Sequence, residues 1–343
     1  MKPLSSQPQK SPKPCGLLLV LASLLASCAA SVEQTAMLEQ EPVLLVIERD
    51  SQTLTSLGTS SPISQLSLAG ESTHFALSPS GALGAISLQN EGRIQLLDIT
   101  RMRRGQQIEL GRDRKPADLE FIDEQRLLIG SCKDGAVSLY DSAFGHAHQQ
   151  LDSGGRSATE LVLELESSTF WVLDTISGMI ARMSWERSAV QRSVHLAKDL
   201  TGLFHKESEG ELWTLSISSD RIFILDDKDL SLKREISCAG HPSSLAFERS
   251  GDAWVACQSS HEIVKLDAET DAVKARVAIP LGEDGAAPHP TELLIDEEAR
   301  LVRVVCPGSD SIQIIDMEIE RCVADVQELR SPAKLTKSHL AQL

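Results

Sequence analysis

Charged and polar residues recur along this chain at two positions of a repeating pattern, and they are its best candidates for chemistry. The first position holds Glu71, Lys115, Ser157, Asp199, His241, His289 and Ser331, and the second holds His74, Asp118, Glu160, Gly202, Ser244, Glu292 and Lys334. Carboxylates that converge in a concavity perturb one another's pKa values and attract cations or amines, whereas a lysine among them can pair with an acidic group. We therefore take as candidate ligand-binding residues His74, Asp118, Glu160, Glu292, Lys334, His241 and His289.

Three interpretations of these residues remain open. They could bind a ligand, or they could only line a water-filled funnel in which Lys334 bridges neighbouring acids. His241 and His289 with Asp199 could also form a transition-metal site. Both histidines precede proline, however, so a shared turn geometry explains their recurrence equally well. We predict no metal and no cofactor.

Motifs of known enzymes are missing from the sequence. It contains no G-x-S-x-G elbow, no H-E-x-x-H pair, no Walker loop, no EF-hand loop and no C-x-x-C-H haem site. We therefore assign no catalytic residue and favour a non-enzymatic protein. If the chain is an enzyme, Glu160, Glu292 and His241 are its acid/base candidates.

The candidate residues belong to a repeat of four short stretches in which apolar and polar residues alternate. Residues 243–279 show the unit clearly, and residues 119–141 and 293–326 repeat it. Alternation with a period of two between Gly, Asp, Ser or Asn residues is typical of antiparallel strands. An aspartate closes the third stretch and is expected to bind backbone N–H groups of the following turn; these residues are Asp98, Asp141, Asp226, Asp267 and Asp316. Trp171, Trp213 and Trp254 share one position of the second stretch, where we expect packing between repeats.

These stretches resemble the YVTN-type propeller repeat, with a second strand like Ala253-Trp-Val-Ala-Cys257 and a third strand ending in Leu-Asp. The resemblance covers residues 43–338 and implies an all-β, seven-bladed β-propeller. Propellers of this wider group include lactonase-like proteins, amine-dehydrogenase heavy-chain-like domains and surface-layer proteins. The chain departs from the pattern at residues 83–85, where no aromatic occurs, and at Ser184, which replaces the aspartate.

The two ends of the repeat region predict how the ring closes. Residues 43–70 supply a second, third and fourth strand without a first one, and the carboxyl-terminal residues 331–337 align with the first strand at 241–247. A ring of blades leaves strand edges exposed unless both ends complete one blade. We predict that residues 332–338 form the innermost strand of the first blade, so that the C-terminal strand pairs with the N-terminal blade.

The amino terminus has the features of a targeting segment. Residues 1–14 are polar and basic, and residues 16–27 are uncharged and mostly apolar, a length typical of a signal peptide. The segment ends in Leu25-Ala26-Ser27-Cys28, which resembles a bacterial lipobox. The resemblance implies cleavage before Cys28 and lipidation of its thiol, which attaches the protein to a membrane. An ordinary secretory signal cut near Ala30 is the alternative.

We therefore divide the chain into a lipoprotein signal peptide at 1–27, a tether at 28–41 and a propeller at 42–340. Ala29 follows Cys28, which by resemblance implies sorting to the outer membrane, with the propeller facing the periplasm or the cell surface. The formal net charge of −16 disfavours binding to nucleic acid phosphates. An odd number of cysteines remains beyond Cys28, so at least one thiol is unpaired or forms an intermolecular bond; these are Cys132, Cys238, Cys257, Cys306 and Cys322.

The function that these observations favour is a lipid-anchored envelope propeller that acts as a binding or scaffolding module. We expect the candidate residues to surround one end of the central channel of the propeller, which we call its mouth. The partner is a protein or a small molecule held there. Two alternatives remain: a lactonase or lyase acting from the acidic mouth, and a propeller subunit of a periplasmic redox assembly. The second rests on fold analogy alone.

Overall fold

The computed structural model describes residues 43–57, 62–72, 74–143, 145–164, 167–282, 284–327, 329–330 and 332–338. The expected signal peptide (1–27), the tether (28–41) and the lipidation site Cys28 lie outside these residues, as does Ser331. For Lys334 the backbone is described and the side chain is not. None of the helices in the described part of the chain is long and apolar enough to cross a membrane.

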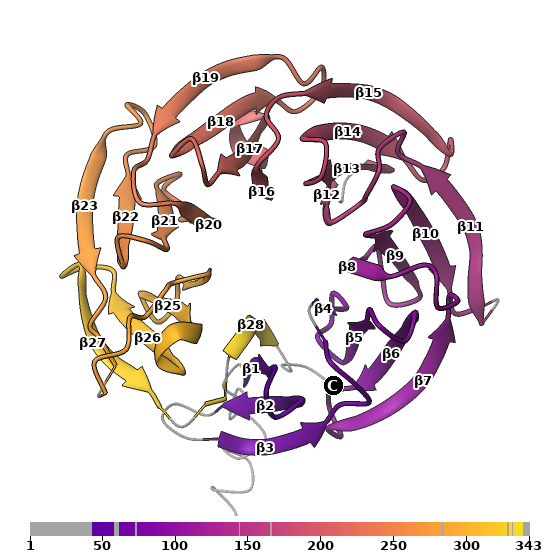
Figure 1. Cartoon of the computed structure of the whole chain (residues 1–343), viewed down its shortest axis with the longest axis horizontal. Helices are drawn as coiled ribbons and strands as arrows, with labels where there is room; N and C mark the ends of the chain where they lie inside the picture. Colours follow the sequence, from indigo (N-terminus) through magenta and orange to yellow (C-terminus); the bar gives the residue numbers. More distant parts are fainter. Residues whose placement is uncertain are drawn as a thin grey trace, which may run out of the picture. The chain divides into compact units, whose positions relative to one another are not determined.

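The described residues form seven four-stranded antiparallel sheets, arranged as blades in a ring around a central axis (Figure 1). We call the region along this axis the channel. Blade 1 contains β28 (Pro332–Ser338), β1 (Val43–Glu48), β2 (Thr53–Leu57) and β3 (Pro62–Ser67). Blade 2 contains β4 (Phe75–Leu77), β5 (Leu83–Leu88), β6 (Arg93–Asp98) and β7 (Arg103–Glu109), and blade 3 contains β8 (Pro116–Phe121), β9 (Arg126–Ser131), β10 (Ala136–Asp141) and β11 (His146–Asp152). Blade 4 contains β12 (Glu160–Glu164), β13 (Thr169–Asp174), β14 (Met179–Ser184) and β15 (Ala189–His195).

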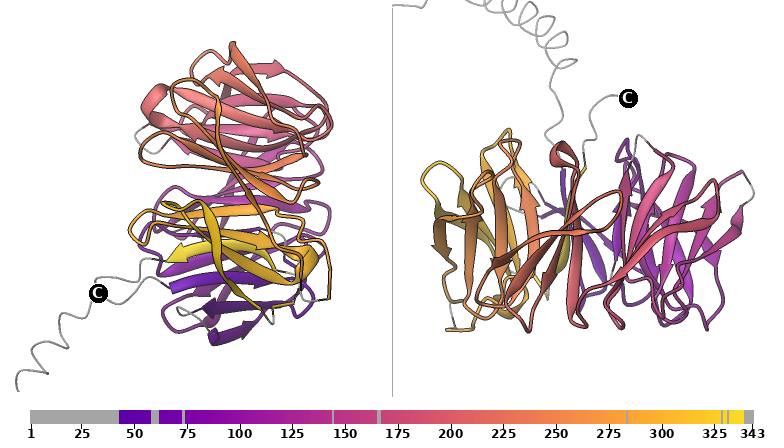
Figure 2. Two further views of the ribbon diagram at one scale, coloured as in Figure 1. Left: turned by 90° about the vertical axis from the view of Figure 1, so that its left-hand side faces the viewer. Right: turned by 90° about the horizontal axis from the view of Figure 1, so that it is seen from above.

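Blade 5 contains β16 (Leu200–Lys206), β17 (Glu211–Ser216), β18 (Arg221–Asp226) and β19 (Leu232–Ser237), with the short 3-10 helix η1 (Glu207–Glu209) after β16. Blade 6 contains β20 (Pro242–Phe247), β21 (Ala253–Cys257), β22 (Glu262–Leu266) and β23 (Val273–Ala278). Blade 7 contains β24 (Glu292–Asp296), β25 (Leu301–Cys306), β26 (Ser311–Asp316) and β27 (Arg321–Val326), with η2 (Pro307–Ser309) after β25. In each blade the first strand lies nearest the channel and the fourth lies outermost, and the blades stand side by side when the ring is viewed edge on (Figures 1 and 2). The predicted all-β, seven-bladed fold is confirmed.

The repeated aspartates form the predicted turns between the third and fourth strands. In blade 5, Asp226 Oδ1 accepts hydrogen bonds from the N–H groups of Lys228 and Asp229, at 3.0 and 3.2 Å. These backbone bonds lower the pKa of Asp226. In blade 4, where serine replaces the aspartate, Ser184 Oγ still accepts a bond from the Arg187 N–H at 3.3 Å. The turn role inferred from sequence is confirmed, and serine fulfils it with fewer bonds.

Apolar side chains fill the spaces between neighbouring blades. Trp213 of β17 packs in one cluster with Leu245 and Val255 of blade 6. Trp171 and Trp254 are fully buried and Trp213 is 2% exposed, so the tryptophans are core residues as predicted. Because every blade buries a face against the next, the ring holds the seven inner strands at fixed places around the channel.

Blade 1 is closed by both ends of the propeller. The carboxyl-terminal strand β28 pairs antiparallel with β1, with Val46 opposite Leu335 and Leu44 opposite Lys337. In Figure 1 the yellow β28 accordingly lies on the channel side of the indigo β1. The predicted closure by residues 332–338 is confirmed.

Candidate ligand-binding mouth of the channel

A cavity of about 320 Å³ opens where the loops entering the first strands meet the turns between the second and third strands. We call it the mouth cavity. Its volume lies at the lower end of the range found for small-molecule sites. Its lining residues are Arg49, His74, Glu160, Thr201, Gly202, Phe204, Ser243, Ser244, Thr291, Glu292, Pro307, Pro332 and Ala333.

The second recurring position of the sequence accounts for much of this lining. His74, Glu160 and Glu292 all line the mouth cavity, together with Gly202 and Ser244 from the same position of blades 5 and 6. Lys334, the equivalent residue of blade 1, directly follows the lining residue Ala333 in β28. Since equivalent residues of successive blades face the same axis, the repeat alignment brings these distant residues together.

Asp118 occupies the same repeat position but has a different environment. Its side chain is buried, and its Oδ2 accepts a hydrogen bond from the Leu161 N–H at 2.9 Å. Leu161 lies on β12, the innermost strand of blade 4. The N–H groups on the edge of β12 that faces away from β13 have no further strand to pair with. Asp118 therefore links blades 3 and 4, and it is not among the described residues that line the cavity.

Three residues of the first recurring position share a backbone geometry. Lys115, His241 and His289 each precede a proline and each adopt a positive φ, of 45°, 60° and 48°. The His241 N–H donates to Asp220 Oδ1 at 2.8 Å, and its side chain is exposed. The shared turn geometry, which was one of the two explanations for the His-Pro pairs, thus exists in the structure.

The histidines do not meet at one point. His289 packs edge to face against His261, with ring centroids 4.8 Å apart, whereas the carboxylate of Asp199 accepts hydrogen bonds from Ser216 and Ser218. No group of three or more His, Cys, Asp or Glu side chains that could bind a metal occurs within the described part of the chain. Of the acid/base candidates, Glu160 and Glu292 line the mouth cavity and His241 is not among its lining residues.

Sequence reasoning missed Arg49 and Phe204. Arg49 lies in the turn between β1 and β2, outside the aligned first strands. Phe204 lies on β16 just after a register shift between Thr201 and Leu203. Gly202 sits in this bulge with φ of 70°, and a Cβ there would approach the Phe204 ring to 2.7 Å. A glycine inside a strand pattern is the signal that could have indicated the bulge.

The loop at residues 281–290, which connects β23 to β24, lies against blade 7. The Gly308 N–H donates to the Pro288 carbonyl at 3.1 Å, and Gly282 N–H donates to the Ala286 carbonyl at 2.9 Å. A Cβ on Gly308 would come within 2.1 Å of the Ala287 carbonyl oxygen, so the loop is packed closely on η2. The described residues of this loop are not among those that line the mouth cavity.

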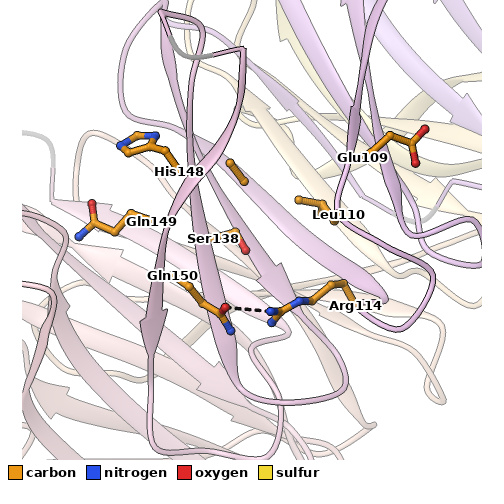
Figure 3. A pocket seen from close by; sticks show the side chains of 8 residues that line it. Glu109, Leu110, Arg114, Ser138, His148, Gln149 and Gln150 are labelled. Carbon is orange, nitrogen blue, oxygen red and sulfur yellow. Dashed lines mark hydrogen bonds between the residues drawn. The ribbon is translucent and has the colours of Figure 1, made fainter.

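A second hollow of about 280 Å³ lies on the side of the ring, between the outer parts of blades 2 and 3 (Figure 3). Glu109, Leu110, Arg114 and Gln150 contribute to this lateral groove. The Arg114 guanidinium donates to Gln150 Oε1 at 2.8 Å and to Asp134 at 2.7 Å. Its charge therefore already has partners within the protein. The mouth cavity, built from most of the blades, is the better candidate site.

Comparisons with known proteins identify the fold and no family. No protein-family model matches the chain, and no curated protein matches it. A functionally unknown protein from Desulfotomaculum acetoxidans superposes with a TM-score of 0.70 at 10% identity, over 87% of this chain and 99% of the other. Kuenenia stuttgartiensis hydrazine synthase has a TM-score of 0.66 at 12% identity, over 80% and 92% of the two chains. A computationally designed protein, Ika8, has a TM-score of 0.63 at 12% identity, over 85% and 86%. At such identities the likeness extends to the propeller fold alone.

Proposed function

We propose that this chain is a bacterial envelope lipoprotein whose propeller binds a small ligand carrying a cationic group in the mouth cavity. The observation that carries the proposal is the lining of that cavity, where Glu160 and Glu292 come from blades 4 and 7. A partly enclosed carboxylate attracts a cation more strongly than one in bulk water because the local dielectric constant is lower. The net charge of −16 adds a long-range attraction for cations.

The other lining side chains favour a ligand of mixed polarity. Arg49 can pair with an acidic group on the ligand, whereas Phe204 and Pro332 supply apolar surface. Small-molecule sites commonly combine a few polar groups with apolar walls in this way. An amine that also bears an acidic or apolar part would use both kinds of surface.

The binding half of the proposal is tested on the solubilised full-length protein. Native mass spectrometry of protein purified from its own membranes should detect a retained small molecule, and spermidine, as a defined cation probe, should raise the melting temperature. The double variant Glu160→Gln, Glu292→Gln should lose both effects and keep its fold. Glu109→Gln in the lateral groove is the matched control and should behave like the wild type. Retention of the molecule and of the spermidine effect in the double variant would disprove the site.

The anchoring half depends on Leu25-Ala26-Ser27-Cys28. Cells fed an alkyne-labelled fatty acid should transfer the label to the wild type and not to Cys28→Ser, and the variant should keep its uncleaved amino-terminal segment. Cys132→Ser is the control for loss of a thiol elsewhere and should remain labelled. An unlabelled wild-type protein with an amino terminus near Ala30 would show that the segment is an ordinary secretory signal.

A further inference from the structure

We propose that Cys238 and Cys257 form a disulfide bond that joins blade 5 to blade 6. Their Sγ atoms are 3.7 Å apart, and both side chains are buried, at 3% and 0% exposure. Cys238 directly follows the last strand of blade 5 and Cys257 ends a strand of blade 6, so a bond between them would add a second covalent link to the main-chain connection between these blades.

The two cysteines lie at neighbouring strand ends in a setting that already fixes their separation. Cys238 directly follows β19, and its N–H donates to the Asp220 carbonyl at 2.8 Å. Cys257 ends β21 and lies opposite Pro242 on β20. Both side chains belong to the apolar cluster between blades 5 and 6.

The turn that connects blade 5 to blade 6 passes close to the two cysteines. Gly240 adopts φ of 105°, and a Cβ at that position would lie 3.2 Å from Cys257 Cβ. Because a disulfide has an S–S length of about 2.05 Å, its formation needs the sulfurs to approach by side-chain rotation while the turn stays in place.

The bond forms by exchange with a disulfide-bearing oxidant, either a protein or a small molecule such as oxidised glutathione. The two thiols share a hydrogen bond in which either sulfur can donate, and this contact lowers the pKa of Cys238 and raises that of Cys257. The Cys238 thiolate attacks one sulfur of the oxidant, forming a mixed disulfide and releasing the other sulfur as a thiol. Cys257 then loses its proton and attacks the Cys238 sulfur, so the second thiol leaves. The pair loses two electrons and two protons, and the oxidant gains them. Since both sulfurs are buried in the closed ring, this exchange precedes closure or uses local opening.

The remaining cysteines of the described region have other neighbours. The Cys306 thiol donates to the Val304 carbonyl and the Cys322 thiol to the Ala278 carbonyl, each at 3.7 Å. The Cys132 sulfur accepts a bond from Gln89 Nε2 at 2.9 Å. The pairing proposed here therefore leaves Cys132, Cys306 and Cys322 outside the bond, and the odd cysteine count requires at least one of them to be unpaired or bound to another molecule.

The bond would hold blades 5 and 6 in a fixed relative position on one side of the mouth cavity. Thr201 on β16 and Ser244 on β20 line that cavity from the two blades that the disulfide would join. The pairing itself depends on neither the proposed ligand nor the lipid anchor, because it follows from the geometry of the blade 5–blade 6 interface alone.

The test uses the purified full-length chain, reduced and then equilibrated in glutathione buffers of increasing oxidised fraction. Free thiols are alkylated in denaturant and the protein is digested with trypsin, which places Cys238 in residues 235–249 and Cys257 in residues 250–265. We expect these two peptides to appear linked, two hydrogen masses lighter than the reduced pair. The oxidised protein should also melt about 5 °C higher than the reduced protein.

Two variants serve as controls. Cys306→Ser should retain the linked peptides, and Cys257→Ser should leave Cys238 alkylated. The proposal is overturned if wild-type protein gives only the two separately alkylated peptides across the buffer series, or if the linked peptides contain other cysteines. The tryptic peptides of the wild-type protein show whether Cys238 and Cys257 are linked even if a variant fails to fold. Absence of the lipid label on Cys28 would not alter this result, so the two proposals fail independently.

Discussion

The seam of blade 1 and the junction of blades 5 and 6 stabilise the same ring by different means. At the seam, β28 and β1 come from opposite ends of the propeller and are joined by a ladder of main-chain hydrogen bonds. At the junction the chain is continuous, and side chains connect the blades. Trp213 Nε1 donates to Glu211 Oε2 at 3.0 Å within blade 5, and Arg234 of blade 5 binds Glu211 of its own blade and Asp271 of blade 6.

This difference indicates where the molecule is sensitive to deletion and where it is sensitive to substitution. Main-chain pairing tolerates changes of side chain but is lost when the strand is removed. A buried ion pair depends on both partners, because removal of one leaves the other charged and without compensation. The two regions therefore predict effects of different size.

The largest effect is expected at the seam. Deletion of residues 331–343 removes β28 and exposes the N–H and C=O groups of β1 along Val43–Glu48. We expect no soluble folded propeller, as measured by circular dichroism and size-exclusion chromatography. Deletion of residues 339–343 alone leaves β28 in place and should have little effect. A chain lacking 331–343 that melts like the full-length protein would refute the role of the seam.

An intermediate effect is expected at the junction. Burial by itself would raise the pKa of Glu211, but hydrogen bonds from Arg234 and Trp213 lower it, so this carboxylate is charged and depends on its partners. Arg234→Met keeps the apolar stem and removes the charge, and we expect a loss of about 2 kcal/mol in the free energy of unfolding.

The matched control for this substitution is Arg276→Met on the outer strand of blade 6. Arg276 pairs with Glu262, but about half of its side chain is exposed, and exposed ion pairs contribute less than about 1 kcal/mol. Urea unfolding of both variants measures the difference. Equal losses would mean that the burial of Glu211 does not determine the contribution of its ion pair.

The fold could be predicted from the sequence because it follows from a local pattern repeated many times. Alternating residues specify each strand, and Asp267 and its equivalents specify the turn after the third strand in five of the blades, so an irregular repeat is recognised from the others. The closing strand was predictable for a related reason, since the first blade lacked one strand and residues 332–338 supplied it. Neither inference needed a side-chain position.

The mouth cavity could be predicted only in part, because its lining depends on side-chain direction. The repeat position correctly grouped His74, Glu160 and Glu292. It could not distinguish them from Asp118, which turns to bind the Leu161 N–H of the next blade. It also could not place Phe204, since a bulge in β16 changes the register there. Ligand binding at these residues stays a prediction.

The third effect, similar in size to the second, concerns a contact that occurs in both blade 1 and blade 4. Glu48 at the seam and Asp174 in blade 4 each end the second strand of a blade. Each accepts a hydrogen bond from a backbone N–H in the loop that leads into the first strand of the same blade. Glu48 accepts from Arg330 at 2.8 Å, and Asp174 accepts from Arg156 at 2.7 Å. Burial alone would raise the pKa of Asp174, but hydrogen bonds from Ser157, Ser177 and the Arg156 N–H lower it to about 2.

Because the pKa of Asp174 is lower in the folded protein than its ordinary value of 3.8, this carboxylate stabilises the fold fully above pH 4. Its contribution, about 2 kcal/mol, is lost as the pH falls from about 4 to about 2, where the folded form also takes up the proton. Asp174→Asn should therefore be less stable than the wild type at pH 7 and approach it at low pH, as measured by urea unfolding across this range. Asp113→Asn, an exposed carboxylate paired only with Lys133 among its described neighbours, should follow the wild type throughout. A constant difference between Asp174→Asn and the wild type from pH 7 to pH 2 would mean that the loop contact needs the side chain's shape and not its charge.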